Sequence, residues 1–267
     1  MKKILLILLL LILMSVNQRC VLAADQTIDQ GYTSYLTALD TYRLSHQDYE
    51  TAKTAYLQYK TPTSQQDFLE RGKKVLTDRD DVLINYLNFL LLRLVISPGV
   101  NFSDQTVFQS KIKVQIQYYI NHKDSINAIF NLDDLTKKSQ EAEKQYQTTL
   151  AVVNYVIGII LIGKTDYAFS QVEQFTSLLG AYTTLNSVSD KSSGLITRWT
   201  LEARNNQLLS RNKVNEARTK FDKLGSSYSV DVDSIFNDGK MSILQSFQYL
   251  KTQYTFLKQI LETQINE

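Results

Sequence analysis

The segment Gly158–Thr165 reads GIILIGKT and matches each fixed position of the phosphate-binding loop pattern G-x-x-x-x-G-K-[ST]. In such a loop, backbone N–H groups surround the phosphates of a nucleotide, the lysine contacts the outer phosphates, and the hydroxyl binds Mg²⁺. The loop must follow a buried strand and open a helix. The residues that would bind the nucleotide are Gly158, Gly163, Lys164 and Thr165.

The residues around this motif favour a different interpretation. Its four variable positions are large and apolar, which is unsuitable for a tight loop around a polyanion: Ile159, Ile160, Leu161 and Ile162. The three-four spacing of apolar residues from Leu150 to Tyr182 passes through the motif without a change of phase, as in a helix. We therefore interpret the match as accidental, predict no cofactor, and expect Gly158 and Gly163 to be close-packing or bend points in a buried helix. The strand-favouring residues between Leu150 and Ile157 keep nucleotide binding as a remote alternative.

Metal-binding and catalytic residue patterns are scarce. The two histidines, His46 and His122, have no partners at metal-ligand spacing, and we interpret both as solvated or as residues of a last helical turn. The adjacent acids Asp80 and Asp81 diverge on a helix, although carboxylate pairs can also assemble from distant positions. The chain has no G-x-S-x-G or H-E-x-x-H motif, so we predict that it is not an enzyme and that it binds no metal.

An acidic segment, Asp231–Gly239, partly resembles a calcium loop. The spacing fails because Ile235 and Phe236 occupy the positions of a ligand and a glycine. The segment instead predicts a capped helix start.

The N-terminus has the layout of a secretory signal peptide. Lys2 and Lys3 precede an apolar run, Ile4–Met14, and small residues follow at Ala23 and Ala24. We predict a signal peptide at residues 1–23, cut after Ala23 or alternatively after Ala24, with an uncleaved membrane anchor as the other alternative. The protein would then be exported, to a periplasmic, cell-surface or secreted location.

Removal of this peptide changes the composition of the chain. It deletes Lys2, Lys3 and Arg19, which leaves 26 of the 29 basic residues against 27 acidic ones and turns a formal charge of +2 into −1. It also deletes Cys20, the one cysteine. A mature chain of this charge has no electrostatic footprint for nucleic acid, and we predict none as a partner.

Long helices are the elements that the remaining residues predict. The chain of 267 residues has two prolines, Pro62 and Pro98, and nine glycines. Breaks are expected near 61–63, 97–104, 129–134, 187–195 and 225–234, with Pro62 in a first turn, and Ser103 or Asp104 capping one helix start and Asn131–Asp134 another. A regular seam is expected in the last helix: Ile243, Phe247, Leu250, Tyr254, Leu257 and Leu261.

These helices predict an all-α fold, an elongated antiparallel bundle or coiled-coil-like hairpins of about five or six helices. One domain spanning 24–267 is the simplest organisation, and two sub-bundles divided near 130 or 190 are the alternative. Residues 145–163 carry no formal charge, which leaves open a marginal membrane span, although a buried helix suits their polar content better.

Tyrosines recur every seven residues near the N-terminus, and small residues follow three places after most of them: Tyr35, Tyr42, Tyr49 and Tyr56, with Ala38, Ser45, Ala52 and Tyr59. The small residues favour a helix seam filled by the rings. A row of exposed tyrosines would instead be a contact surface for a protein or a sugar. A seam completed by a second chain would produce self-association.

Two stretches, Tyr56-Leu57-Gln58-Tyr59 before a helix break and Arg79-Asp80-Asp81-Val82-Leu83 opening an apolar helix, carry a family resemblance. Over residues 30–95 the chain resembles a set of uncharacterised exported, all-helical bacterial proteins, which implies a secreted helical bundle and no biochemical activity. We expect a structural or protein-interaction protein of the cell envelope or surface. The alternative is a helical binding module for a small ligand or glycan.

Overall fold

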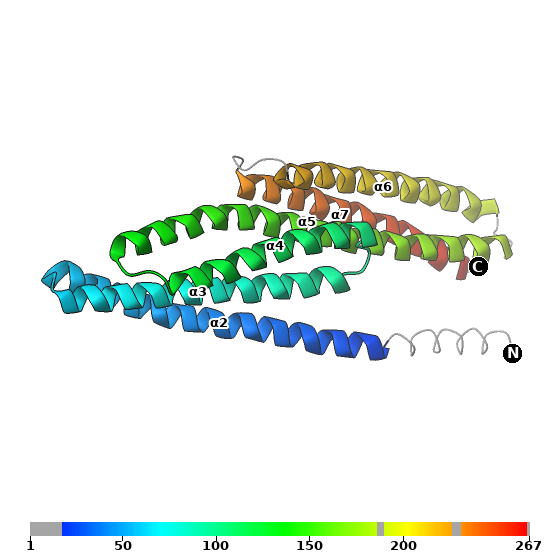
Figure 1. Ribbon diagram of the computed structural model, residues 1–267. Helices are drawn as coiled ribbons and strands as arrows, with labels where there is room; N and C mark the ends of the chain where they lie inside the picture. The colour runs from blue at the N-terminus through cyan, green and yellow to red at the C-terminus, as the bar shows by residue number, and fades with distance from the viewer. Residues whose placement is uncertain (1–17, 186–189, 226–230, 266–267) are drawn as a thin grey trace. The chain divides into compact units, whose positions relative to one another are not determined.

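The computed structural model describes residues 18–185, 190–225 and 231–265, and within them the fold is all-α, as predicted. Its helices are α2 (Gln18–Tyr59), α3 (Pro62–Ile96), α4 (Phe102–Ile126), α5 (Leu132–Leu185), α6 (Asp190–Asp222) and α7 (Val232–Ile265), with a 3₁₀ turn, η1, at Lys223–Gly225 (Figure 1). Most of the predicted signal peptide and part of the predicted break at 187–195 lie outside the described residues. The predicted cut after Ala23 lies inside α2.

The chain forms two compact units. Unit 1 contains the residues up to Ile96 together with Gln109–Gln145, and unit 2 contains Ser97–Phe108 together with Tyr146–Glu267. Helices α4 and α5 therefore contribute residues to both units, and the unit boundaries do not coincide with a loop at 130 or 190.

Polar side chains define where several helices begin. The Asn101 carboxamide accepts a hydrogen bond from the Asp104 backbone N–H at 2.8 Å, and the Asn131 carboxamide accepts the equivalent bond from Asp134 at 2.8 Å. The cap of α4 is thus Asn101, and the prediction of Ser103 or Asp104 was wrong by two or three residues. Asp231 caps α7 by accepting from the Ser234 N–H at 3.0 Å, which confirms the capped start predicted in place of a calcium loop.

Unit 1 contains the tyrosine seam, between the antiparallel helices α2 and α3 (Figure 1). Ser45 and Ala52 are buried, as the large-small pattern predicts, whereas Tyr59 is exposed at the end of α2. The rings of Tyr35, Tyr49 and Tyr56 contact aromatic side chains of α3, with Tyr35 5.3 Å from Tyr86 between ring centroids. An aliphatic cluster joins α3 to α4, its following loop and α5: Leu69, Leu76, Ile126, Ile129, Leu132 and Leu135.

Unit 2 packs α5, α6 and α7 together at small residues. A Cβ added to Gly158 of α5 would lie 2.6 Å from Phe221 Cγ of α6, so the two helices approach closely there because this residue is a glycine. The Ser210 hydroxyl of α6 donates to the Ser246 carbonyl of α7 at 2.7 Å, and both serines are fully buried. The phosphate-loop motif is therefore continuous helix at a close-packing point, as the apolar spacing predicted.

The buried face of α7 differs from the predicted seam. Ile243, Leu250 and Leu257 are buried as expected, but Phe247 is 39% and Tyr254 is 49% exposed. Polar residues take the place of these two rings: Ser242, Ser246 and Gln253 are buried. The face of α7 that is buried therefore includes its serines, whose small side chains let α6 approach closely. The spacing of hydrophobic residues alone does not reveal this close approach.

Helix α5 is the one helix among the described residues that is long and apolar enough to cross a bilayer. Within Leu132–Tyr182, 61% of its most apolar 18-residue window is buried inside the protein. A helix buried in a protein core needs the same composition.

Candidate binding pocket

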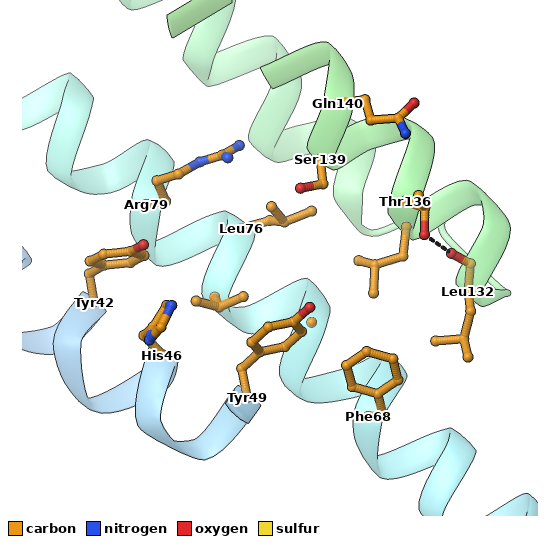
Figure 2. Close-up of a pocket in the computed structure, with 13 residues that line it drawn as sticks. Tyr42, His46, Tyr49, Phe68, Leu76, Arg79, Leu132, Thr136, Ser139 and Gln140 are labelled. Atoms are coloured by element: carbon orange, nitrogen blue, oxygen red, sulfur yellow. Dashed lines mark hydrogen bonds between the residues drawn. The ribbon is translucent and has the colours of Figure 1, made fainter. Parts of the chain in front are cut away.

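Unit 1 contains a pocket of about 330 Å³ between α2, α3 and the first turns of α5 (Figure 2). This volume lies at the lower end of the range of small-molecule sites, about 300–1,000 Å³. Its apolar floor consists of core side chains, Val75 and Leu76 of α3 and Leu132 and Leu135 of α5. The pocket is thus a hollow in the aliphatic cluster, and the same packing that holds the helices together positions its walls.

Aromatic side chains form one wall of the pocket. Tyr42, His46 and Tyr49 come from successive turns of α2, and Phe68 comes from α3 (Figure 2). Their rings follow one another at centroid distances of 5.8 Å from Tyr42 to His46, 6.3 Å from His46 to Tyr49 and 5.3 Å from Tyr49 to Phe68. Rings at such spacing offer a flat or ring-shaped ligand several faces to pack against.

Polar groups form the opposite rim. Thr136, Ser139 and Gln140 lie on exposed positions of α5, and Arg79 reaches the pocket from α3 (Figure 2). The Thr136 hydroxyl donates to the Leu132 carbonyl at 2.9 Å and is therefore used within the helix. Arg79 is the one formally charged side chain among the described residues that line the pocket.

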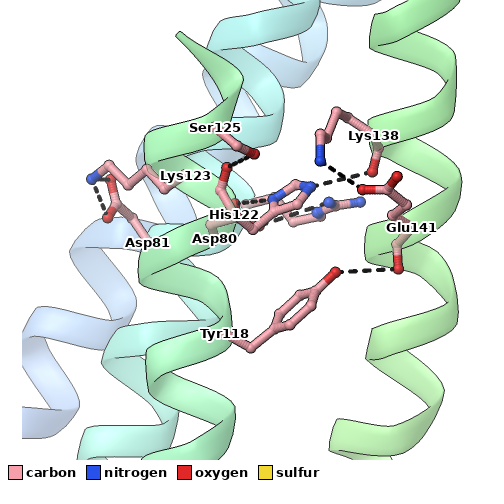
Figure 3. Close-up of polar contacts among 9 residues, drawn as sticks. Asp80, Asp81, Tyr118, His122, Lys123, Ser125, Lys138 and Glu141 are labelled. Carbon is pink, nitrogen blue, oxygen red and sulfur yellow. Dashed lines mark hydrogen bonds and ion pairs between the residues drawn. The ribbon is translucent and has the colours of Figure 1, made fainter. Parts of the chain in front are cut away.

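A buried ion pair lies next to Arg79. Asp80 Oδ2 is 2.6 Å from His122 Nδ1, and the two side chains are 0% and 2% exposed (Figure 3). The second ring nitrogen, Nε2, is 3.2 Å from the Lys138 carbonyl of α5. His122 thus ties α3, α4 and α5 together, and its interpretation as a solvated histidine was wrong: it belongs to the last turns of α4, but it points into the core.

Both ring nitrogens of His122 face oxygen atoms, those of the Asp80 carboxylate and the Lys138 carbonyl. Asp80 therefore uses its Oδ2 atom in the contact with His122, and its second carboxylate oxygen, Oδ1, is directed elsewhere.

The charges around this pair are matched among themselves. Lys123 donates to Asp81 at 2.6 Å, and Lys138 donates to Glu141 at 2.7 Å, which lowers the pKa of Glu141. Asp80 and Asp81 point apart along α3, as predicted for neighbours on a helix (Figure 3). Burial, and then the charge of Glu141, raise the pKa of Tyr118, whose ring stacks on His122 at 6.0 Å.

The predicted tyrosine surface divides between two roles. Tyr42 and Tyr49 line the pocket, whereas Tyr35 packs on Tyr86 and Tyr56 stacks on Phe68 at 5.5 Å. Gly158, Gly163, Lys164 and Thr165 are not among the pocket residues and belong to α5 within unit 2. There the Thr165 hydroxyl donates to the Leu161 carbonyl at 2.8 Å.

Sequence reasoning missed Arg79, Phe68, Ser139 and the Asp80–His122 pair as members of a site. One available signal was the acidic dipeptide Asp80-Asp81, matched 42 residues later by the basic dipeptide His122-Lys123. A charge that is buried on folding requires a partner, and a second dipeptide of opposite sign supplies one.

The arrangement is suited to binding. His122 has both ring nitrogens engaged and a 2% exposed side chain, so it offers no free base to a molecule in the pocket. Within the described residues, no three His, Cys, Asp or Glu side chains are grouped so that they could hold a metal ion. Comparisons of the chain with protein-family models, with curated proteins and with solved structures give no match.

Proposed function

We propose that this chain is an exported helical binding protein that takes up a small organic ligand in the unit 1 pocket. The observation that carries the proposal is the composition of the pocket, an aromatic wall and an apolar floor facing a polar rim. Ligand sites in proteins are concave and mostly apolar, with a few polar groups that fix orientation. Export is supported by the signal-peptide layout of residues 1–23.

Binding rather than catalysis is supported by the state of the charged groups. Among the described residues, no carboxylate lines the pocket, and the lysines behind its wall, Lys123 and Lys138, are paired with Asp81 and Glu141. A general base must reach the proton it removes. The fold instead offers a preformed hollow with rigid rings.

A ligand screen with a pocket-filling variant tests this function. Ser139 lies exposed on the rim, so Ser139→Phe adds a ring to the pocket without disturbing the core. Ser103→Phe adds the same ring at an exposed position of α4 outside the pocket and is the matched control. A library of neutral sugars, aromatic compounds, amines and organic acids is screened by thermal shift.

At least one compound should raise the unfolding midpoint of the wild type and of Ser103→Phe, and should leave Ser139→Phe unchanged. A library with no active compound contradicts the proposal. So does a compound that stabilises Ser139→Phe as much as the wild type, because that compound binds elsewhere.

A structural or protein-interaction role is the second candidate, and a specific observation in unit 2 favours it. Three leucines of α5 and α6 are largely exposed, Leu178 by 70%, Leu201 by 61% and Leu208 by 59%. An interaction through these side chains predicts a complex or a self-associated form. Light scattering of the wild type and of the triple Leu→Ser variant tests it, and a monomer in both cases speaks against self-association.

A further inference from the structure

Arg79 lines the pocket, and some of its hydrogen-bond donors have no acceptor among the described residues. Its side chain is 23% exposed, and its Nη2 lies 3.7 Å from Asp80 Oδ1, too far for a hydrogen bond. Buried Nε and Nη2 of Arg79, and Oδ1 of Asp80, have no hydrogen-bond partner among the described residues. Buried polar atoms in native proteins are mostly paired, so these three atoms mark an incomplete site.

The carboxylates around Arg79 make their hydrogen bonds to other groups. Asp80 uses Oδ2 with His122 at 2.6 Å, and its Oδ1 lies 3.7 Å from Arg79 Nη2. Glu141 accepts from Lys138, and Asp81 accepts from Lys123. The guanidinium therefore has no hydrogen-bonded counter-charge among the described residues, and it lies at the wall of the pocket.

We infer that the ligand of this pocket is a small organic anion with a flat ring, held by its acid group at Arg79 and by its ring at the aromatic wall. A guanidinium fork matches a carboxylate in shape and in charge. Tyr49 and Phe68, 5.3 Å apart, supply the faces for the ring. The Ser139 hydroxyl and the Gln140 carboxamide lie on the rim and can bond polar substituents of the ring.

This inference rests on the proposed function, and it adds the chemical class of the ligand. A neutral sugar would also pack on tyrosine rings, but its hydroxyls accept weaker hydrogen bonds from a guanidinium than a carboxylate does. A cation would meet the charge of Arg79 directly and be repelled. Among the ligands that the aromatic wall admits, the anion is thus the one that the charges select.

The test compares 4-hydroxybenzoate with 4-hydroxybenzamide, which have the same size and ring but differ in charge. Calorimetric titration of the wild type should show the acid binding at least about tenfold more tightly, because a hydrogen bond to a charged group is stronger than one between neutral groups. Arg79→Gln should remove this preference and bind the two compounds equally. Arg79→Lys, which keeps the charge and loses the fork, should retain part of it.

The results separate the ligand class from the function. If the amide, or the neutral methyl glucoside, binds as tightly as the acid, the anion inference is overturned while the pocket remains a binding site. If neither benzoate compound binds and the library screen gives only neutral ligands blocked by Ser139→Phe, the class is again wrong and the function stands. If the screen gives no compound whose binding Ser139→Phe blocks, both the anion inference and the proposed binding function are contradicted. The comparison on the wild type does not depend on the stability of any variant.

Discussion

At the scale of residues, the His122 side chain joins three helices of unit 1. It contacts the carboxylate of α3 through Nδ1 and a carbonyl of α5 through Nε2, from its own position on α4. A buried carboxylate without a partner is costly, so the pair is held as a unit. The pair also restrains the part of α3 that carries Arg79, because Asp80 is the next residue of the same helix.

His122→Ala should lower the free energy of unfolding by about 3 kcal/mol, because the variant leaves Asp80 buried without its hydrogen-bond partner. Lys123→Ala removes the neighbouring base from an ion pair whose side chains are 37% and 38% exposed, and it should cost less than about 1 kcal/mol. Urea unfolding measures both. Equal effects of the two substitutions would show that the buried pair has no special role.

Glu216 supplies a pH prediction in unit 2. Hydrogen bonds from Lys213, then from Lys220 and the Ser242 hydroxyl, lower its pKa from 4.5 to about 2. A carboxylate whose pKa is lower in the folded state stabilises the fold above pH 4.5, and this contribution is lost as the pH falls toward 2. Because the side chain is 40% exposed, the contribution is small.

The difference in stability between the wild type and Glu216→Gln should therefore be present at pH 7 and shrink between about pH 4.5 and pH 2. Chemical unfolding of both proteins across this interval measures the difference. NMR titration of the Glu216 side chain gives its pKa independently. A midpoint near 4.5, with a stability difference independent of pH, would contradict the assigned hydrogen bonds.

At the scale of elements, two glycines of α5 allow the effect of helix packing on stability to be distinguished from the effect of helix propensity. A Cβ at Gly158 meets the ring of Phe221, whereas a Cβ at Gly180 meets no heavy atom of the described residues within 4 Å. Both are helical positions where alanine is intrinsically better than glycine by about 0.5–1 kcal/mol. The same substitution thus has opposite expected signs on one helix.

Gly158→Ala should destabilise the protein, by about 1–3 kcal/mol for an overpacked contact, while Gly180→Ala should stabilise it by about 0.5–1 kcal/mol. Thermal unfolding of the two variants shows the signs. If Gly158→Ala is neutral or stabilising, the close approach of α5 and α6 is not as described, and the motif containing Gly158 needs another explanation.

The elements were largely predictable from the sequence because their signals are local. Prolines, asparagine and aspartate caps and uninterrupted apolar spacing marked most helix ends to within a few residues, and the helical phase through Gly158–Thr165 was correct. The exposed face of α7 was not predictable in this way. Its rotation depends on Ser210 and Ser246 meeting across two helices, a contact that neither helix encodes alone.

At the scale of the whole molecule, the residues that form the pocket come from three separate helices, which explains why sequence reasoning found only part of it. The tyrosines were noticed because they repeat within α2, and two of them line the pocket. Arg79 and Ser139 carry no such repeat, and their meeting depends on how α3 and α5 pack in unit 1. A fold predicted from local patterns does not specify that packing.

Export remains a proposal about the whole chain, and it predicts a particular mature form. Cells expressing the full sequence should release or display a protein whose N-terminus is Ala24, or Asp25 if the cut follows Ala24. N-terminal sequencing and intact mass of the processed protein measure this. A protein that keeps Met1 and stays in the cytoplasm would contradict export and leave the pocket proposal untouched.

Unit 1 is proposed to hold a small ligand against its aromatic wall, and intermolecular NOEs locate the place where the ligand binds. NMR of the full protein with the best compound from the screen should show intermolecular NOEs from the ligand to the rings of Tyr42, Tyr49 and Phe68. NOEs confined to exposed side chains of unit 2 such as Leu201 or Leu208, or no NOEs under saturating ligand, would contradict the account.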